Sequence, residues 1–176
     1  MKILVTGGAG YIGSHTCVEL LNEGFEVVVI DNFSNSKSSS LDAIKKITGK
    51  DFKFYEIDYL DKDALNKVFE ENKIDAVINF AGFKAVGESV QKPIEYYTNN
   101  LMTTLVVAKM MKKYHVPSIV FSSSATVYGD PEVVPAGSYA KEALTNLGVW
   151  DSIQDRLSLA GNVTEVLSQV ETQNAE

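Results

Sequence analysis

The stretch VTGGAGYIG, residues 5–13, decides the fold class of this chain. Three of its glycines, Gly7, Gly10 and Gly13, stand at intervals of three between a short apolar run and a helical segment. A tight turn and a close backbone approach to a pyrophosphate require residues without a Cβ, and a helix N-terminus supplies N–H donors and positive potential. We also expect Gly13 to let the helix pack against the sheet. The stretch therefore predicts a dinucleotide-binding loop, with an ordinary glycine-rich turn as the alternative.

Short apolar runs and helical segments alternate along the chain. We expect strands over residues 2–6, 26–31, 52–58, 76–80 and 118–122, and helices over 11–22, 40–48, 62–72 and 93–114. The nearly continuous apolar run 27–30 is typical of a strand that is buried on both faces. The alternation predicts an α/β fold, a Rossmann-like doubly wound parallel sheet of about five strands with helices on both faces.

The composition excludes several classes of protein. Of the 176 residues, 45% are hydrophobic and 22% are charged, which argues against a disordered chain or a membrane bundle. The net charge of -7 argues against nucleic acid or a membrane surface as a partner. The single cysteine, Cys17, fits a reducing compartment, and the first apolar run is too short for a signal peptide, so we expect a cytoplasmic protein. His15 and His115 form no metal-ligand pattern, so no metal is expected.

The second expected strand ends at Asp31, about 20 residues beyond the glycine loop. This is the place of the carboxylate that binds the ribose 2′-hydroxyl of a dinucleotide. An acid there favours NAD over NADP, because it would repel a 2′-phosphate. An aspartate that caps a helix or a turn is the alternative. Asp58 ends the third expected strand, where an adenine contact and a turn aspartate both stay open.

Five stretches of the sequence resemble the UDP-glucose 4-epimerases, a family of extended short-chain dehydrogenases/reductases. They are residues 5–15, 31–36, 80–90, 96–100 and 122–129, and the resemblance covers residues 1–135. The third and fifth stretches are more specific than the glycine loop. The resemblance implies a tightly held NAD that takes a hydride from C4 of a UDP-sugar and returns it to the other face. This reaction interconverts UDP-glucose and UDP-galactose in galactose metabolism.

The resemblance also implies roles for individual residues. As catalytic residues, Ser124 would hydrogen-bond the reacting sugar hydroxyl and Thr126 would help to hold the substrate. Tyr59 stands where the family usually has an aliphatic residue. For Lys84 and Asn99, an ordinary helical position is the alternative. The residues implied to contact the cofactor are Gly7, Gly10, Tyr11, Ile12, Gly13, Asp31, Asn32, Phe33, Asn35, Ser36, Asp58, Tyr59, Phe80, Ala81, Gly82, Lys84, Asn99 and Ser122.

One part of the family pattern is missing from the sequence. The resemblance implies a Tyr and a Lys four residues apart on one helix, about 25 residues after the active-site serine, where the Lys lowers the phenol pKa. Residues 149–153 occupy that place, and no Tyr-x-x-x-Lys follows Ser124. Tyr139 and Lys141 are two residues apart, which turns their side chains about 200° apart on a helix. We therefore expect an inactive or impaired epimerase. The alternatives are an NAD-binding module without turnover and a non-functional truncated fusion.

The chain from residue 136 onward differs from the part before it. It has two basic and six acidic residues and no strand pattern, with helices expected from Ser138 and Asn162. Parts of it resemble periplasmic molybdate-binding proteins, without most of what would enclose an oxyanion. We predict an NAD-binding Rossmann domain over 1–135 and an acidic helical tail of different origin over 136–176, with no substrate domain. The expected partner is a UDP-sugar, and the open edge of the truncated sheet predicts self-association.

Overall fold

The computed structural model describes residues 1–122 and, beyond them, Glu142, Thr145 and Asn146, which are helical. The chain divides into two compact units, Met1–Ser122 and Ser123–Glu176. The first unit carries the fold described below. Ser124, Thr126 and nearly all of the predicted helical tail lie outside the described residues.

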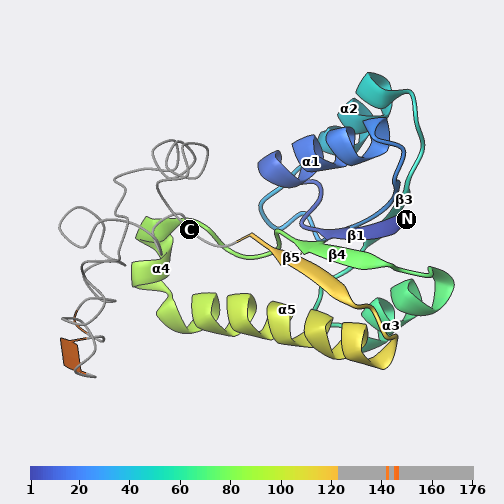
Figure 1. Cartoon of the computed structure of the whole chain (residues 1–176). Helices are drawn as coiled ribbons and strands as arrows, with labels where there is room; N and C mark the ends of the chain where they lie inside the picture. The colour runs from blue at the N-terminus through green and yellow to red at the C-terminus, as the bar shows by residue number, and fades with distance from the viewer. Residues whose placement is uncertain (123–141, 143–144, 147–176) are drawn as a thin grey trace. The chain divides into compact units, whose positions relative to one another are not determined.

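The first unit is a five-stranded sheet with helices on both faces (Figure 1). Its strands are β1 Lys2–Thr6, β2 Glu26–Asp31, β3 Lys53–Glu56, β4 Ala76–Asn79 and β5 Ser118–Phe121. Its helices are α1 Tyr11–Asn22, α2 Ser39–Thr48, α3 Lys62–Glu71, α4 Val86–Gln91 and α5 Pro93–Lys113. The strand order is β3-β2-β1-β4-β5, and all neighbours are parallel. The predicted Rossmann-like fold is confirmed, and the loop after β1 lies where the strand order reverses, the usual ligand position in such sheets.

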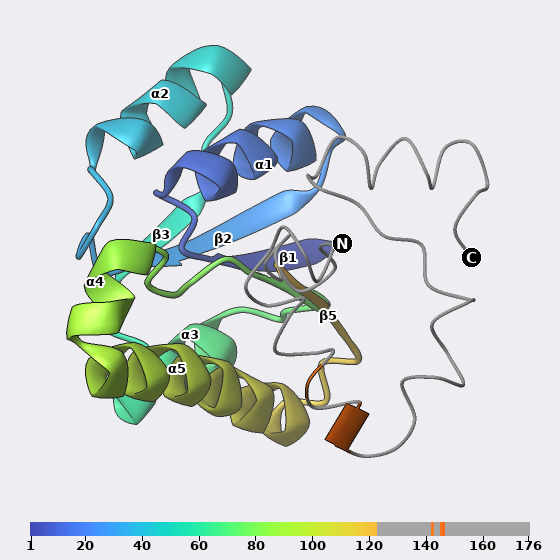
Figure 2. The ribbon, with the colours of Figure 1, turned by 90° about the vertical axis from the view of Figure 1, so that its left-hand side faces the viewer.

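Alternate residues of the central strands face opposite helical layers. Val27 and Val29 of β2 pack with residues of α1 and α2, whereas Val28 and Ile30 pack with residues of α3 and α5. Figures 1 and 2 show these two pairs of helices on opposite faces of the sheet. Because both faces are covered, β2 is buried after its first residue, as its apolar run predicts.

Local side chains set the ends of several helices. The Asp61 carboxylate accepts hydrogen bonds from the backbone N–H groups of Asp63 and Ala64, at 3.2 and 3.0 Å, and so caps α3. Helix α5 carries Pro93 in its first turn, as predicted. Helix α4 is not among the predicted elements, because six residues that include Gly87 are too few to show a helical period.

The third strand is shorter than the predicted range 52–58. Beyond it, the Asp58 carboxylate accepts a hydrogen bond from Leu60 N at 2.8 Å, and the Asp58 carbonyl accepts one from Asp61 N at 3.0 Å. These local bonds turn the chain into α3 instead of continuing the ladder, so the predicted end of this strand is wrong. The other predicted elements differ from the observed bounds by at most one residue at an end. No helix within the described part of the chain is long and apolar enough to cross a membrane.

Candidate functional site

The glycine loop after β1 is closed tightly on its neighbours. Gly7 has φ +68°, and a Cβ there would lie 2.9 Å from Ala81 N. A Cβ on Gly8 would lie 2.7 Å from Val29 Cγ1, and one on Gly13 would overlap the Gly7 carbonyl oxygen. Gly8 therefore allows the close approach to strand β2. The three atoms nearest to a Cβ on Gly13 belong to Gly7 and Gly8, directly after β1, so Gly13 lets α1 start close against the loop. Its role in packing the helix on the sheet stays a prediction.

Helix α1 begins at this loop without a side-chain cap. Its N-cap residue, Gly10, has an extended backbone with φ -69° and ψ 171° and offers no side-chain acceptor. The first N–H groups of a helix have no intrahelical acceptor, so those of Tyr11 and Ile12 are available to a ligand. The helix end thus presents N–H donors and the positive end of its dipole, an arrangement that suits an anion such as a pyrophosphate.

Asp31, at the end of β2, joins the glycine loop to the loop that follows β2. The residue is 5% exposed, and its carboxylate accepts hydrogen bonds from Ala9 N at 3.0 Å, Phe33 N at 2.9 Å and Ser36 Oγ at 2.7 Å. The bond from Phe33 is that of a turn aspartate, the alternative raised by the sequence. Within residues 1–122, Oδ2 accepts a bond from Ala9 alone, so it keeps a lone pair that a ribose hydroxyl can use.

Tyr59 makes a second connection to the glycine loop. Its buried hydroxyl donates to the Ile30 carbonyl oxygen at 3.0 Å and accepts from Gly7 N at 2.7 Å. Gly7 N also donates to the Ile30 carbonyl at 2.9 Å, so the three groups form a closed hydrogen-bonded triangle. Burial, and after it the charge of Asp31, raises the pKa of Tyr59, so the phenol stays protonated.

The loop after β4 forms another wall of the site. Gly82 in this loop has φ +149°, which glycine adopts without strain. Asn100 of α5 holds the next residue: its Oδ1 accepts from Phe83 N at 2.8 Å, and its Nδ2 donates to the Phe83 carbonyl at 3.0 Å. Asn99 Nδ2 donates to the same Asn100 oxygen at 3.0 Å. Asn100 therefore holds the backbone of this loop on helix α5, and the rings of Phe83 and Tyr96, with 5.2 Å between their centroids, add a second contact.

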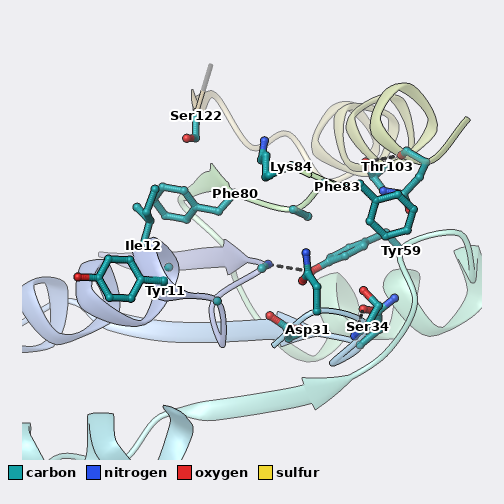
Figure 3. A pocket seen from close by; sticks show the side chains of 18 residues that line it. Tyr11, Ile12, Asp31, Ser34, Tyr59, Phe80, Phe83, Lys84, Thr103 and Ser122 are labelled. Carbon is teal, nitrogen blue, oxygen red and sulfur yellow. Dashed lines mark hydrogen bonds between the residues drawn. The ribbon is translucent and has the colours of Figure 1, made fainter. Parts of the chain in front are cut away.

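The two loops line a single pocket at the carboxyl ends of the strands (Figure 3). Its charged lining side chains are those of Asp31 and Lys84, which Figure 3 shows reaching in from different walls. The residues that the sequence assigned to the cofactor and that the structure brings together here are Gly7, Gly10, Tyr11, Ile12, Gly13, Asp31, Asn32, Asn35, Tyr59, Phe80, Ala81, Gly82, Lys84, Asn99 and Ser122.

Three of the assigned residues lie beside the pocket and support its lining. The ring of Phe33 packs on a phenylalanine of β3, with 5.3 Å between the centroids. Ser36 donates to Asp31, and Asp58 accepts a bond from Asn32 Nδ2 at 3.3 Å. Ser36 and Asp58 therefore position the lining residues Asp31 and Asn32, whereas the ring of Phe33 packs on β3. Direct contact of these three side chains with a cofactor stays a prediction.

The lining also contains Ser34, Phe83 and Thr103, which are absent from the predicted set. Ser34 and Phe83 lie inside stretches that carry the family resemblance. Their place in those stretches was the signal that could have identified them as lining residues. Thr103 lies one helical turn after Asn99, and its hydroxyl donates to the Asn99 carbonyl at 2.8 Å. The four-residue spacing on one helix face was the available signal for Thr103.

The sequence profile of the NAD dependent epimerase/dehydratase family matches residues 3–147. The chain belongs to this family. It is 64% identical to the UDP-glucose 4-epimerase of Bacillus subtilis and 66% identical to that of Haemophilus influenzae, each over 135 residues. These alignments cover 77% of this chain and 40% of each relative, so the chain spans about two fifths of the length of these curated relatives. The resemblance of residues 1–135 to the epimerases, inferred from the sequence, is confirmed, and the resemblance of the tail to molybdate-binding proteins stays a prediction.

Solved structures of epimerase/dehydratase family members share the fold. The UDP-glucose 4-epimerase of Bifidobacterium longum, crystallised with NAD+ and UDP, is 48% identical with a TM-score of 0.73, over 86% of this chain and 50% of that one. The enzyme of Stenotrophomonas maltophila, with bound NAD and formylated UDP-arabinopyranose, is 38% identical with a TM-score of 0.73, over 84% of this chain and 48% of that one. The likeness holds in both sequence and fold over the shared part.

Proposed function

We propose that the pocket binds NAD and that this chain acts as the cofactor-binding part of a UDP-glucose 4-epimerase. The observation that carries the proposal is the uncapped N-terminus of α1 at the glycine loop, with the Asp31 carboxylate at the end of the adjacent strand. The first group suits a pyrophosphate and the second suits a ribose hydroxyl. Two related epimerases were crystallised with NAD, which supports the proposal.

The remaining lining residues fit a dinucleotide in size and charge. Ala81 and Gly82 are small, so a ligand can approach their backbone closely. Lys84 adds a positive charge to the wall that follows β4. Asp31 would repel a 2′-phosphate, which supports NAD over NADP. The pocket therefore offers donors, an acceptor and a close backbone approach where a dinucleotide needs them.

We further propose a UDP-sugar as the substrate. Related structures contain UDP or a UDP-sugar derivative. Bound NAD would supply the hydride acceptor and donor for a reversible oxidation at C4 of the sugar. Ser122 lines the pocket after β5, and we assign the sugar contacts to Ser124 and Thr126, which follow it in the chain.

We propose that this chain alone epimerises poorly or only holds NAD. The Tyr-x-x-x-Lys pair that the family resemblance implies does not follow Ser124, and residues 149–153 stand in its place. A sequence of different origin from residue 136 onward would account for the missing pair. The family profile extends to residue 147 and the first compact unit ends at Ser122, so the division at 135 remains a prediction.

Titration of the purified chain with NAD tests the binding proposal. We expect saturable binding below about millimolar NAD, and loss of binding in Gly10→Val, because the added side chain would occupy the approach of the pyrophosphate. A Cβ on Gly10 meets only the Gly7 carbonyl oxygen, at 3.2 Å, so we expect the variant to fold. Gly87→Val is the matched control, because a Cβ there meets no atom within 4 Å. Absence of binding, or equal NAD affinity in Gly10→Val, would contradict the proposal.

An assay of UDP-galactose conversion with excess protein tests the catalytic part. We expect turnover far below that of a complete epimerase, because the base that takes the sugar proton has no counterpart in this sequence. Turnover within about tenfold of a complete enzyme would show that another group acts as the base. The NAD titration would remain valid in that case.

We also propose self-association through the β5 edge and a cytoplasmic location. β5 is the terminal strand of the described sheet, and its Ile119, Val120 and Phe121 are exposed. Sedimentation velocity should show a concentration-dependent oligomer that Val120→Lys abolishes, and a monomer at every concentration would contradict self-association. The single cysteine of the sequence is a buried free thiol, which suits a reducing compartment.

A further inference from the structure

We infer that Tyr59 is a positioning residue for the glycine loop, and that its hydroxyl holds Gly7 where α1 can present its first N–H groups to a dinucleotide. This inference rests on the proposed NAD binding and adds to it a residue outside the glycine motif. The triangle of Tyr59, Gly7 and Ile30 carries the inference.

The Tyr59 hydroxyl bonds two backbone groups of the protein itself. Its proton is donated to the Ile30 carbonyl, and it accepts the N–H of Gly7, as the dashed line at its oxygen in Figure 3 shows. Both partners are backbone groups, one at the end of β2 and one in the glycine loop. Because burial raises the pKa of the phenol, it remains a neutral donor and adds no negative charge beside the pyrophosphate position.

The position of Gly7 determines the start of helix α1. The Gly7 carbonyl accepts a hydrogen bond from Gly10 N at 3.1 Å, and Gly13 packs directly on it. Gly10 is the N-cap, so a shift of Gly7 moves the residue that precedes the free N–H groups of the helix. Without the hydroxyl, Gly7 N keeps only its bond to the Ile30 carbonyl. The loop would then have more freedom exactly where a ligand needs fixed donors.

Tyr59→Phe tests the inference, because it removes the hydroxyl and keeps the ring in the core formed with α3 and α5. Tyr55→Phe is the matched control. Tyr55 packs against the same core, and its hydroxyl donates to Glu71 at 2.8 Å and accepts from Asn72 at 2.9 Å, but it does not line the pocket. We expect the NAD dissociation constant to rise about three- to tenfold in Tyr59→Phe and to stay within about twofold in Tyr55→Phe.

Hydrogen exchange provides a second measurement that needs no cofactor. In Tyr59→Phe, we expect the amide of Gly7 to exchange several-fold faster relative to the amides of β2, and no such change in Tyr55→Phe. Unchanged Gly7 exchange, or the same rise in the NAD dissociation constant in both variants, would overturn the inference. If the unaltered chain binds no NAD, the proposed function fails instead, and the exchange of Gly7 alone decides the role of Tyr59.

Discussion

The two loops that line the pocket are held in place by different means. Backbone packing holds the glycine loop, because Gly7 lies against Ala81 and a Cβ on Gly13 would overlap Gly7. The side chains of Asp31 and Tyr59 add hydrogen bonds to it. In the loop after β4, Phe83 is held by side chains of α5: Asn100 bonds its backbone, and the ring of Tyr96 lies 5.2 Å from its own ring. Backbone packing is part of the folded core, whereas one amide can be removed with the core intact. We therefore expect side chains added at the packed glycines Gly7 and Gly13 to reduce stability, and the loss of Asn100 to reduce ligand affinity first.

The largest expected effect is that of Gly13→Ala. Its Cβ would overlap the Gly7 carbonyl oxygen and lie 2.8 Å from the Gly8 Cα, and these are backbone atoms that can move only if the loop rearranges. We expect the free energy of unfolding, measured in urea, to fall by about 3 kcal/mol. Gly10→Ala is the control and should change it by less than about 1 kcal/mol. Equal stability of the two variants would show that the loop adapts freely.

Asn100→Ala should have a smaller effect on folding and a clear one on binding. It removes both hydrogen bonds to Phe83, so the backbone of the loop loses these bonds to α5, while the contact between the rings of Phe83 and Tyr96 remains. We expect NAD affinity, measured by titration calorimetry, to fall about tenfold, with a loss of unfolding free energy of about 1–2 kcal/mol. Asn100→Asp keeps the acceptor for Phe83 N, so its NAD affinity should lie between that of the unaltered chain and that of Asn100→Ala. Unchanged NAD affinity in Asn100→Ala would show that the second wall needs no such support.

The smallest effect near neutral pH concerns Cys17, on the helix that follows the glycine loop. Burial raises the pKa of its thiol from 9.0 to about 12. Because the folded-state pKa is the higher one, the stabilisation is complete below pH 9 and is lost as pH rises from 9 towards 12. We expect the unfolding free energy to decline less steeply above pH 9 in Cys17→Ala than in the unaltered chain. Parallel declines would show that the thiol ionises as readily in the folded protein as in the unfolded one.

The comparison of the two loops also shows how far the sequence could predict the site. Gly7, Gly10 and Gly13 were recognisable from their spacing, and Asp31 from its distance to them, because these features depend on residues near one another in the chain. Thr103 and the bonds of Asn100 were not predicted, since the sequence does not show which face of α5 meets the loop. The predicted end of β3 was wrong, because the hydrogen bonds with which Asp58 forms a turn compete with those of the strand ladder.

By itself, the sequence determined the alternation of strands and helices, the dinucleotide-type loop and the family. Hydrophobic period and glycine spacing are local properties that the chain carries into any fold it adopts. The tertiary structure alone decided the strand order, the packing of Gly13 and the role of Tyr59. The Tyr59 hydroxyl meets Gly7 across a sequence separation of 52 residues, and only the pairing of β1, β2 and β3 brings these groups together.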